Sequence, residues 1–224
     1  MTKEEQPAYF TETISEFTAA EDELRNIRPA VSIFGSARIS TDNPVYQQCV
    51  ALAQKLSDTG FNIISGGGPG IMEAANKGAK AGVSRSVGLN IELPHEQFAN
   101  PYQDISLNFK HFFSRKYMFI RHSIAFIAMP GGFGTLDEVS EVLTLVQTQK
   151  MPPAPIILFG EKFWTGLKDW LENSMQPEKL ISSGDSDLLQ VVDNIDEILQ
   201  IVCHHYDKIS QANDSQCECG KWRI

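Results

Sequence analysis

From Ala30 onward, short apolar or β-branched runs alternate with longer amphipathic stretches. Each short run has the length of a buried strand, and each longer stretch has the apolar spacing of a helix. This alternation predicts a doubly wound, Rossmann-like α/β fold in which helices flank a parallel sheet. The expected strands are 31–34, 61–64, 87–91, 124–129 and 155–159; the expected helices are 44–59, 70–81, 114–122, 135–148, 163–175 and 194–208, with a long loop after residue 91.

One large domain fits a chain of 224 residues of which 42% are apolar. We expect this domain to span residues 28–209. The preceding segment, 1–27, is rich in glutamate and holds the isolated aromatics Phe10 and Phe17, which favours a short helix or arm docked on the domain. The last segment, 210–224, is polar and is expected to be a mobile tail.

The charge balance excludes several classes of function. Lysine and arginine total 19 against 28 acidic residues, so the net charge of −9 does not favour binding to nucleic acid or to an anionic membrane. No apolar run is long enough to cross a bilayer and none follows the amino terminus, so we expect a cytoplasmic protein. The pairs Cys217-x-Cys219 and His204-His205 lack the spacing of a zinc site, and we expect no metal.

The strongest candidate for chemistry follows the expected strand 124–129. There residues 130–134, Pro-Gly-Gly-Phe-Gly, lead into a helix that is expected to open at Thr135. Glycines let the backbone approach a ligand closely, and a helix amino terminus presents N–H groups with a partial positive charge, which suits a phosphate. The alternative is structural: Thr135 and Glu138 have the Thr-x-x-Glu spacing of a capping box, and the glycines would then form only a tight turn.

A second glycine cluster, Ser-Gly-Gly-Gly-Pro-Gly at 65–70, follows the expected strand 61–64. Gly67 and Gly68 could cradle an anion, although the cluster matches neither the dinucleotide-binding nor the Walker A pattern. A plain strand-to-helix turn explains the cluster equally well. Ser36, which follows the first strand, would lie beside this cluster and could contribute a hydroxyl group.

Two adjacent cations, Arg115 and Lys116, interrupt the aromatic, helix-like segment 112–119. Successive helical residues point about 100° apart, so the two side chains are expected to face different surroundings. One would bind an anionic ligand while the other meets a carboxylate. The alternative is a solvated helix face, on which neither cation has a specific role.

Together, Arg115-Lys116 and the motif Pro-Gly-Gly-Phe-Gly-Thr-Leu-Asp-Glu at 130–138 resemble the Lonely Guy family of cytokinin riboside 5′-monophosphate phosphoribohydrolases, often labelled lysine decarboxylase-like. The family signature Pro-Gly-Gly-x-Gly-Thr-x-x-Glu is matched without a gap, and the resemblance extends over residues 30–202. Pro69 and Glu73 differ from plant-type members. The chain is therefore more similar to the general bacterial branch, whose members act on purine nucleotides such as AMP.

The resemblance implies that Arg115 and Glu138 form the catalytic pair. The reaction would break the bond between C1′ of ribose 5-phosphate and the base, with Glu138 stabilising an oxocarbenium-like transition state and activating water. It would require no cofactor, and family membership implies a homodimer. The residues implied to line the nucleotide site are Glu96, Lys116, Gly131, Gly132, Phe133, Gly134, Thr135, Asp137 and Thr144.

Two other functions are compatible with parts of the sequence. Molybdenum-cofactor carrier proteins resemble this fold and also use glycine-rich loops, but a non-catalytic carrier would need no arginine–glutamate pair. A decarboxylase would need pyridoxal phosphate on a lysine with a carboxylate partner, and no lysine here stands in such a setting. The presence of Arg115 and Glu138 favours the hydrolase.

Overall fold

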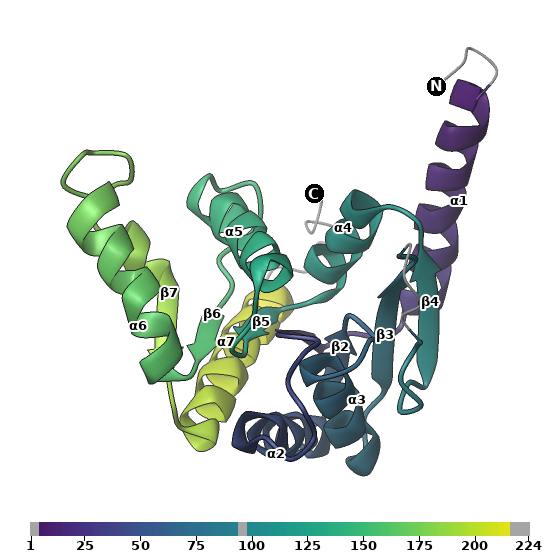
Figure 1. Cartoon of the computed structure of the whole chain (residues 1–224), viewed down its shortest axis with the longest axis horizontal. Coiled ribbons are helices and arrows are strands. Elements are labelled where there is room, and N and C mark those ends of the chain that lie inside the picture. The colour runs from purple at the N-terminus through teal and green to yellow at the C-terminus, as the bar shows by residue number, and fades with distance from the viewer. Residues whose placement is uncertain (1–4, 94–97, 216–224) are drawn as a thin grey trace. The chain divides into compact units, whose positions relative to one another are not determined.

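The computed structural model describes residues 5–93 and 98–215, and within them it confirms the expected α/β fold (Figure 1). The strand order is β4-β3-β2-β1-β5-β6-β7. The strands are β1 (Ala30–Phe34), β2 (Asn62–Ser65), β3 (Ser86–Ile91), β4 (Ile105–Phe109), β5 (Ala125–Ala128), β6 (Ile156–Phe159) and β7 (Leu189–Val192). The α-helices are α1 (Glu5–Leu24), α2 (Pro44–Asp58), α3 (Ile71–Ala81), α4 (Phe112–His122), α5 (Phe133–Gln147), α6 (Glu161–Trp170) and α7 (Ile195–Ser215).

The chain divides into two compact units, where the sequence suggested one domain. The first unit comprises the chain up to Ser32 together with Ala37–Ser123, and the second comprises Ile33–Ser36 together with the chain from Ile124 onward. Strand β1 therefore contributes its first residues to one unit and its last residues to the other.

The first unit contains a parallel sheet in which β2 pairs with β1, β3 with β2 and β4 with β3. Helices α2 and α3 pack against each other, and α1 packs against α4 and β4 (Figure 1). The start of α2 follows from its sequence, because the Asn43 side chain accepts a hydrogen bond from the Val45 N–H at 2.9 Å and Pro44 opens the helix. The arm expected at 1–27 is mostly this docked helix α1.

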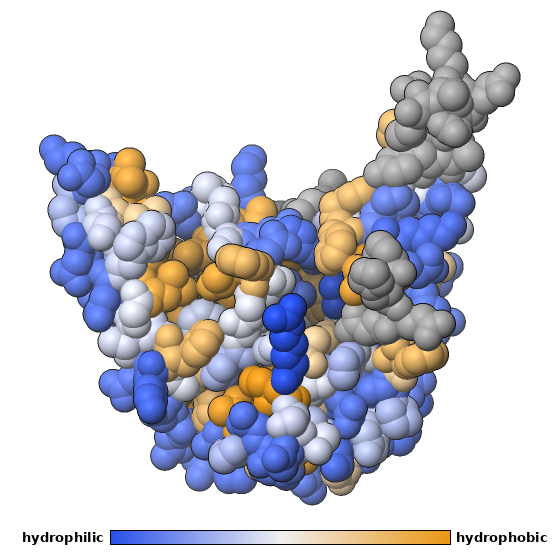
Figure 2. Space-filling model, viewed as in Figure 1, coloured by the Kyte–Doolittle hydropathy of each residue, from blue (hydrophilic) through white to orange (hydrophobic). Residues whose placement is uncertain are grey.

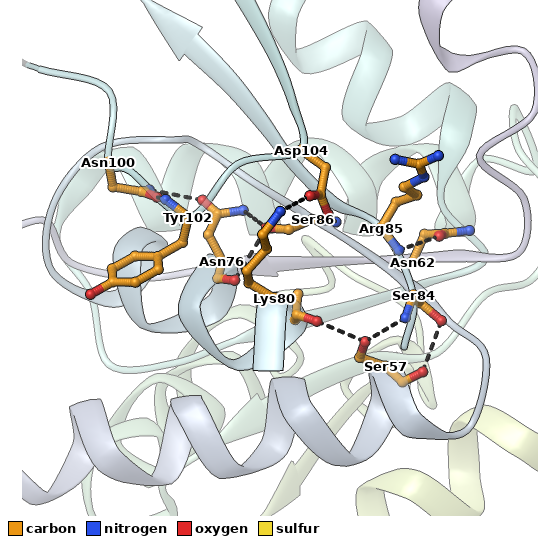
Figure 3. A network of polar contacts seen from close by, with 11 residues as sticks. Ser57, Asn62, Asn76, Lys80, Ser84, Arg85, Ser86, Asn100, Tyr102 and Asp104 are labelled. Carbon is orange, nitrogen blue, oxygen red and sulfur yellow. Dashed lines mark hydrogen bonds and ion pairs between the residues drawn. The ribbon is translucent and has the colours of Figure 1, made fainter. Parts of the chain in front are cut away.

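A buried polar network ties α3 to the sheet of the first unit (Figure 3). The Asn76 side chain has no exposed surface, and its amide group donates to Ser86 Oγ at 2.9 Å and to the Val87 carbonyl at 3.0 Å. Its oxygen accepts from Ser65 Oγ at 2.6 Å and from Asn100 Nδ2 at 2.8 Å. Both donors and both acceptor positions of the amide are thus filled, which is what a buried amide requires.

The second unit contains β5, β6 and β7 in parallel, with the end of β1 at its edge. Strands β5 and β6 are buried along their whole lengths, as expected for strands covered on both faces. Helix α5 contacts β5 and β6, α6 contacts β6 and β7, and α7 contacts β7. Their packing explains why the strand sequences read as unbroken apolar runs.

Three parts of the fold differ from the sequence-based expectation. Strand β4 occupies part of the expected long loop, and β7 was not predicted. Helix α6 ends at Trp170 and passes into a π-helical turn, Leu171–Met175. Helix α7 continues through Ser215, past the expected domain end at residue 209. No helix among the described residues has both the length and the apolar character needed to cross a membrane.

The Asn76→Ala variant should lower the free energy of unfolding by about 3 kcal/mol, because several buried polar partners lose their hydrogen bonds and each unsatisfied group costs on the order of 1–3 kcal/mol. Urea denaturation measures the change. Asn108→Ala, which removes an exposed asparagine from β4, is the matched control and should cost less than about 0.5 kcal/mol. Equal losses in the two variants would contradict a structural role for the network.

Candidate functional site

The motif at 130–138 forms the start of α5 in the second unit. The helix begins at Phe133, two residues earlier than expected, and Gly132 is its N-cap residue. The Gly132 carbonyl accepts the first helical hydrogen bond, from the Leu136 N–H at 3.0 Å. The amides of Phe133, Gly134 and Thr135 therefore have no acceptor within their own helix, and the first turn carries no acidic side chain. This end of α5 has the electrostatics of an anion site.

The capping-box alternative is wrong for this helix. A capping box requires Thr135 at the N-cap position, but Thr135 is the third residue of α5 and is buried. The N-cap residue is Gly132, which has no side chain to accept a hydrogen bond. Glu138 therefore lies one turn inside the helix, where it is partly buried and is not needed to cap the helix start.

The three glycines of this motif are under different structural demands. A Cβ atom on Gly131 would lie 2.1 Å from Thr135 Oγ1 and 2.5 Å from Thr135 Cβ, so only glycine fits there. A Cβ atom on Gly132 or Gly134 would meet nothing within 4 Å, and neither residue has a positive φ. Packing and backbone conformation thus explain Gly131 but leave Gly132 and Gly134 without a structural reason.

The end of β1 and the end of β5 are joined within the second unit. The Met129 N–H donates to the Phe34 carbonyl at 2.9 Å, and the Ser36 N–H donates to the Pro130 carbonyl at 3.1 Å. In the strand order, β1 and β5 are the neighbours at which the sequence order reverses. Ligands of open α/β sheets bind beyond the carboxyl ends of the strands at such a point. Ser36 thus lies beside the glycine motif.

In the first unit, the glycine cluster at 65–70 forms a tight turn between β2 and α3. Gly67 has a φ of +74°, and its Cβ atom would lie 2.1 Å from Asn90 Oδ1. The carbonyl of Gly67 accepts hydrogen bonds from Asn100 Nδ2 at 3.0 Å and Gln103 Nε2 at 2.8 Å, and the carbonyl of Gly68 accepts one from Asn100 Nδ2 at 3.1 Å. Structural demands therefore account for Gly67.

Arg115 is buried at the carboxyl ends of β2 and β3 in the first unit, with 6% of its surface exposed. Its Nε–H donates to the Leu89 carbonyl at 2.7 Å, and Nη2 lies 3.3 Å from the Gly66 carbonyl. The guanidinium also stacks over the Phe119 ring. A solvated helix face is therefore excluded for Arg115. A Cβ atom on Gly66 would lie 2.2 Å from Arg115 Nη2, so a side chain there would displace the guanidinium.

The remaining candidate residues occupy varied positions. Lys116 is partly buried on α4, so the two adjacent cations differ in their surroundings as expected. In α5, the Phe133 side chain is 92% exposed, and Asp137 is also exposed. Glu96 lies outside the described residues, as do Cys217 and Cys219. The assignment of these residues to a nucleotide site stays a prediction.

An apolar groove of about 370 Å³ lies on the other side of α5 in the second unit, where Figure 2 shows hydrophobic residues in the hollow between α5 and α6. Leu136, Leu143 and Thr144 line it from α5, and Thr144 Oγ1 donates to the Ser140 carbonyl at 2.7 Å. Thr144 and Glu138 are six residues apart and so point about 120° apart around the helix. Thr144 therefore faces the groove and not the side of α5 that carries Glu138.

Sequence reasoning missed the residues that hold the first glycine cluster and the amino end of α4. Asn76, Asn100 and Gln103 hold the first glycine cluster, and Glu16 of α1 contacts the amino end of α4. Their partners lie up to 98 residues away in the chain, so no local pattern reveals them. The one available signal was an amide residue, Asn76, in the middle of the apolar face of a helix.

Comparison with known proteins gives the family. The chain matches the family model described as possible lysine decarboxylase over residues 72–202, more than half of its length. The chain belongs to this family. The match includes the Pro-Gly-Gly-x-Gly-Thr-x-x-Glu motif and so confirms the resemblance to the Lonely Guy proteins.

Two relatives of this lysine decarboxylase-like family member are named for an activity. A probable cytokinin riboside 5′-monophosphate phosphoribohydrolase from Oryza sativa subsp. japonica is 36% identical over 102 residues, which are 44% of this chain and 41% of the rice protein. The chain thus spans less than half the length of that relative. A cytokinin riboside 5′-monophosphate phosphoribohydrolase from Mycobacterium marinum is 29% identical over 152 residues, which are 67% of this chain and 81% of that protein.

Among solved structures, the molybdenum cofactor binding protein of Rippkaea orientalis resembles this family member with a TM-score of 0.59. The two are 20% identical, and the match covers 79% of this chain and 96% of the other. At this identity the likeness supports the shared fold and nothing further.

The two glycines Gly131 and Gly134 should respond differently to alanine. Gly131→Ala should lower the free energy of unfolding by about 1–3 kcal/mol, because the new methyl group forces the buried Thr135 to move. Gly134→Ala is the matched control and should leave stability unchanged or raise it by up to about 1 kcal/mol, because alanine favours a helix. Urea denaturation of both variants gives the comparison. A destabilised Gly134→Ala variant would show that the fold requires this glycine after all.

Proposed function

We propose that the protein hydrolyses the N-glycosidic bond of a nucleoside 5′-monophosphate and releases a free base and ribose 5-phosphate. The observation that carries this proposal is the start of α5, where Gly132 and Gly134 have no structural reason to be glycine. A ligand that lies against the backbone supplies such a reason, because a side chain at either position would block its approach. A phosphate is the ligand best suited to a helix amino terminus.

The relatives support the reaction class. Two relatives, from Oryza sativa subsp. japonica and Mycobacterium marinum, are named as a probable phosphoribohydrolase and a phosphoribohydrolase of a cytokinin riboside 5′-monophosphate. That substrate is a nucleotide with a 5′-phosphate and an N-glycosidic bond. AMP has the same ribose 5-phosphate group, and we propose a purine nucleotide such as AMP as the substrate of this chain.

Glu138 is the carboxylate that we assign to catalysis. It lies four residues after Gly134, so it follows the proposed phosphate-binding amides by about one helical turn on the same side of α5. When the bond between C1′ and the base nitrogen breaks, positive charge develops on the sugar, and a carboxylate stabilises that charge. Glu138 would also accept a proton from the water that attacks C1′, and the released base would receive a proton in exchange.

Arg115 is the residue that we assign to substrate orientation. Its guanidinium is held by two backbone carbonyls and by the Phe119 ring, so its position is fixed before any ligand binds. A fixed cation can orient a nucleotide without an entropic cost at the moment of reaction. The 5′-phosphate anchors the ribose, and the binding energy of this remote group serves to place C1′ for attack.

AMP should be converted to adenine and ribose 5-phosphate, whereas adenosine should react with a kcat/KM at least about 100-fold lower, because it lacks the phosphate that anchors the ribose. Chromatography of the released base on a panel of nucleoside monophosphates and nucleosides measures both. Gly134→Ala should stay folded and raise the KM for AMP at least about 10-fold, since the added methyl group would obstruct the phosphate. Binding of AMP without release of adenine would favour a carrier function instead.

Replacement of Glu138 by glutamine should lower kcat for base release at least about 100-fold, because the amide neither stabilises a cation nor accepts a proton from water. The Kd for AMP should change less than about 3-fold and the melting temperature should hold, because Glu138 does not cap α5. Glu197→Gln, which alters an exposed glutamate of α7, is the control and should match the wild type. Near-normal turnover in Glu138→Gln would move the catalytic carboxylate to Glu96, Asp137 or Glu141.

A further inference from the structure

Residues 16–21 of helix α1 contact α4 from its amino end to its carboxyl end. At the amino end of α4, the Glu16 carboxylate accepts from the Lys110 N–H at 2.8 Å and from Ser114 Oγ at 2.6 Å. His111 Nδ1 lies 3.3 Å from both carboxylate oxygens. The side chain of Glu16 is only 11% exposed, so these hydrogen bonds are shielded from competing water.

Two further groups of contacts keep α1 in this register. The Phe17 ring lies edge-on to the Tyr117 ring, with 5.3 Å between the centroids. At the carboxyl end of α4, the Glu21 carboxylate lies 3.3 Å from Arg121 Nη2 and 3.0 Å from His122 Nε2. Burial lowers the pKa of His122, so this pair is a hydrogen bond between a neutral imidazole and a carboxylate near neutral pH.

The amino end of α4 needs a partner from elsewhere. Its N-cap residue, His111, makes no side-chain capping hydrogen bond, and its first turn holds no acidic residue. Glu16 supplies from α1 a negative charge at the end of α4 where the helix dipole favours one. Partial burial raises the pKa of the Glu16 carboxyl, but the hydrogen bonds from Ser114, the Lys110 amide and His111 outweigh burial and hold the pKa below its ordinary value.

We propose that Glu16 is a positioning residue, which holds the first turn of α4 and thereby fixes the Arg115 guanidinium at the carboxyl ends of β2 and β3. Ser114, which donates to Glu16, directly precedes Arg115 in the chain. The hydrogen bond from Arg115 Nε to the Leu89 carbonyl depends on where this turn lies. The expected effect on turnover rests on the proposed function, but the effect on Arg115 itself does not.

Exchange of the Arg115 Nε–H proton with solvent gives a readout that does not require activity. This proton is buried and hydrogen bonded in the wild type, and its NMR signal is identified by its loss in Arg115→Lys. Glu16→Gln keeps the size of the side chain but loses one acceptor, and it should accelerate this exchange at least about 10-fold. Glu12→Gln is the matched control on the same helix, because Glu12 forms a half-exposed ion pair with Lys110 Nζ, and exchange there should change less than about 2-fold.

Turnover of AMP gives the second readout. Glu16→Gln should lower kcat on the order of 10-fold, because small misplacements of an orienting group are costly, and Glu12→Gln should leave it unchanged. In an Arg115→Lys background, Glu16→Gln should have less than about a 2-fold further effect, since both changes act through the same group. An undiminished effect in that background, or unchanged Arg115 exchange in Glu16→Gln, would overturn the proposal.

A failure of the proposed function and a failure of the role proposed for Glu16 are distinguishable. If the wild type released no base from any nucleotide, the proposed function would fall, and the exchange experiment alone would decide the role of Glu16. Should Glu16→Gln not fold, Ser114→Ala is the second variant, because it removes the Ser114 hydroxyl that donates to Glu16. Exchange of the Arg115 Nε–H proton should then rise about 3-fold. No increase in Ser114→Ala would count against the proposal.

Discussion

The carbonyl groups that follow β2 are buried and must find hydrogen-bond donors, and this requirement organises the first unit. Buried backbone carbonyls without partners are costly, so nearly all of them are paired in folded proteins. The carbonyl of Gly66 is paired with Arg115, and those of Gly67 and Gly68 with Asn100. Because Asn100 also bonds to Asn76, helix α3, the turn after β2 and the segment before β4 form one connected structure.

The two glycine clusters look alike in sequence but answer different needs. A side chain on Gly66 would displace Arg115, and one on Gly67 would meet Asn90 in a backbone conformation of positive φ. Those residues shape the protein, whatever it binds. Gly132 and Gly134 face no such limits, and at Gly134, inside the helix, alanine would be more stable. Residues that lower stability and that neither packing nor backbone conformation requires are typical of a functional site. The second cluster is therefore the better candidate for ligand contact.

The spacing of apolar residues predicted the buried strands and the amphipathic helices. Strands β5 and β6 are buried on both faces and read as apolar runs, and the amphipathic helices followed from their spacing. Strand β4 was missed although more exposed and less exposed residues alternate along it. It lies in a polar stretch of the sequence and forms an edge of the sheet. The start of α5 was misplaced because threonine is a preferred N-cap residue, which made Thr135 the expected start. The N-cap residue is Gly132. Glu16 could not be found at all, since its partners are remote in the chain.

The phosphate site that we propose belongs to an acidic chain, and the distribution of charge makes the two compatible. The net charge of −9 is a property of the whole sequence, whereas Glu16 and Glu21 are engaged with α4 and each lies against cationic or hydrogen-donating groups. The start of α5 would attract an anion through backbone N–H groups, which carry no titratable charge. These N–H groups keep their character across a wide range of pH, because they do not titrate. At the proposed site, the attraction of an anion thus depends on the direction of amides rather than on the number of cations in the chain.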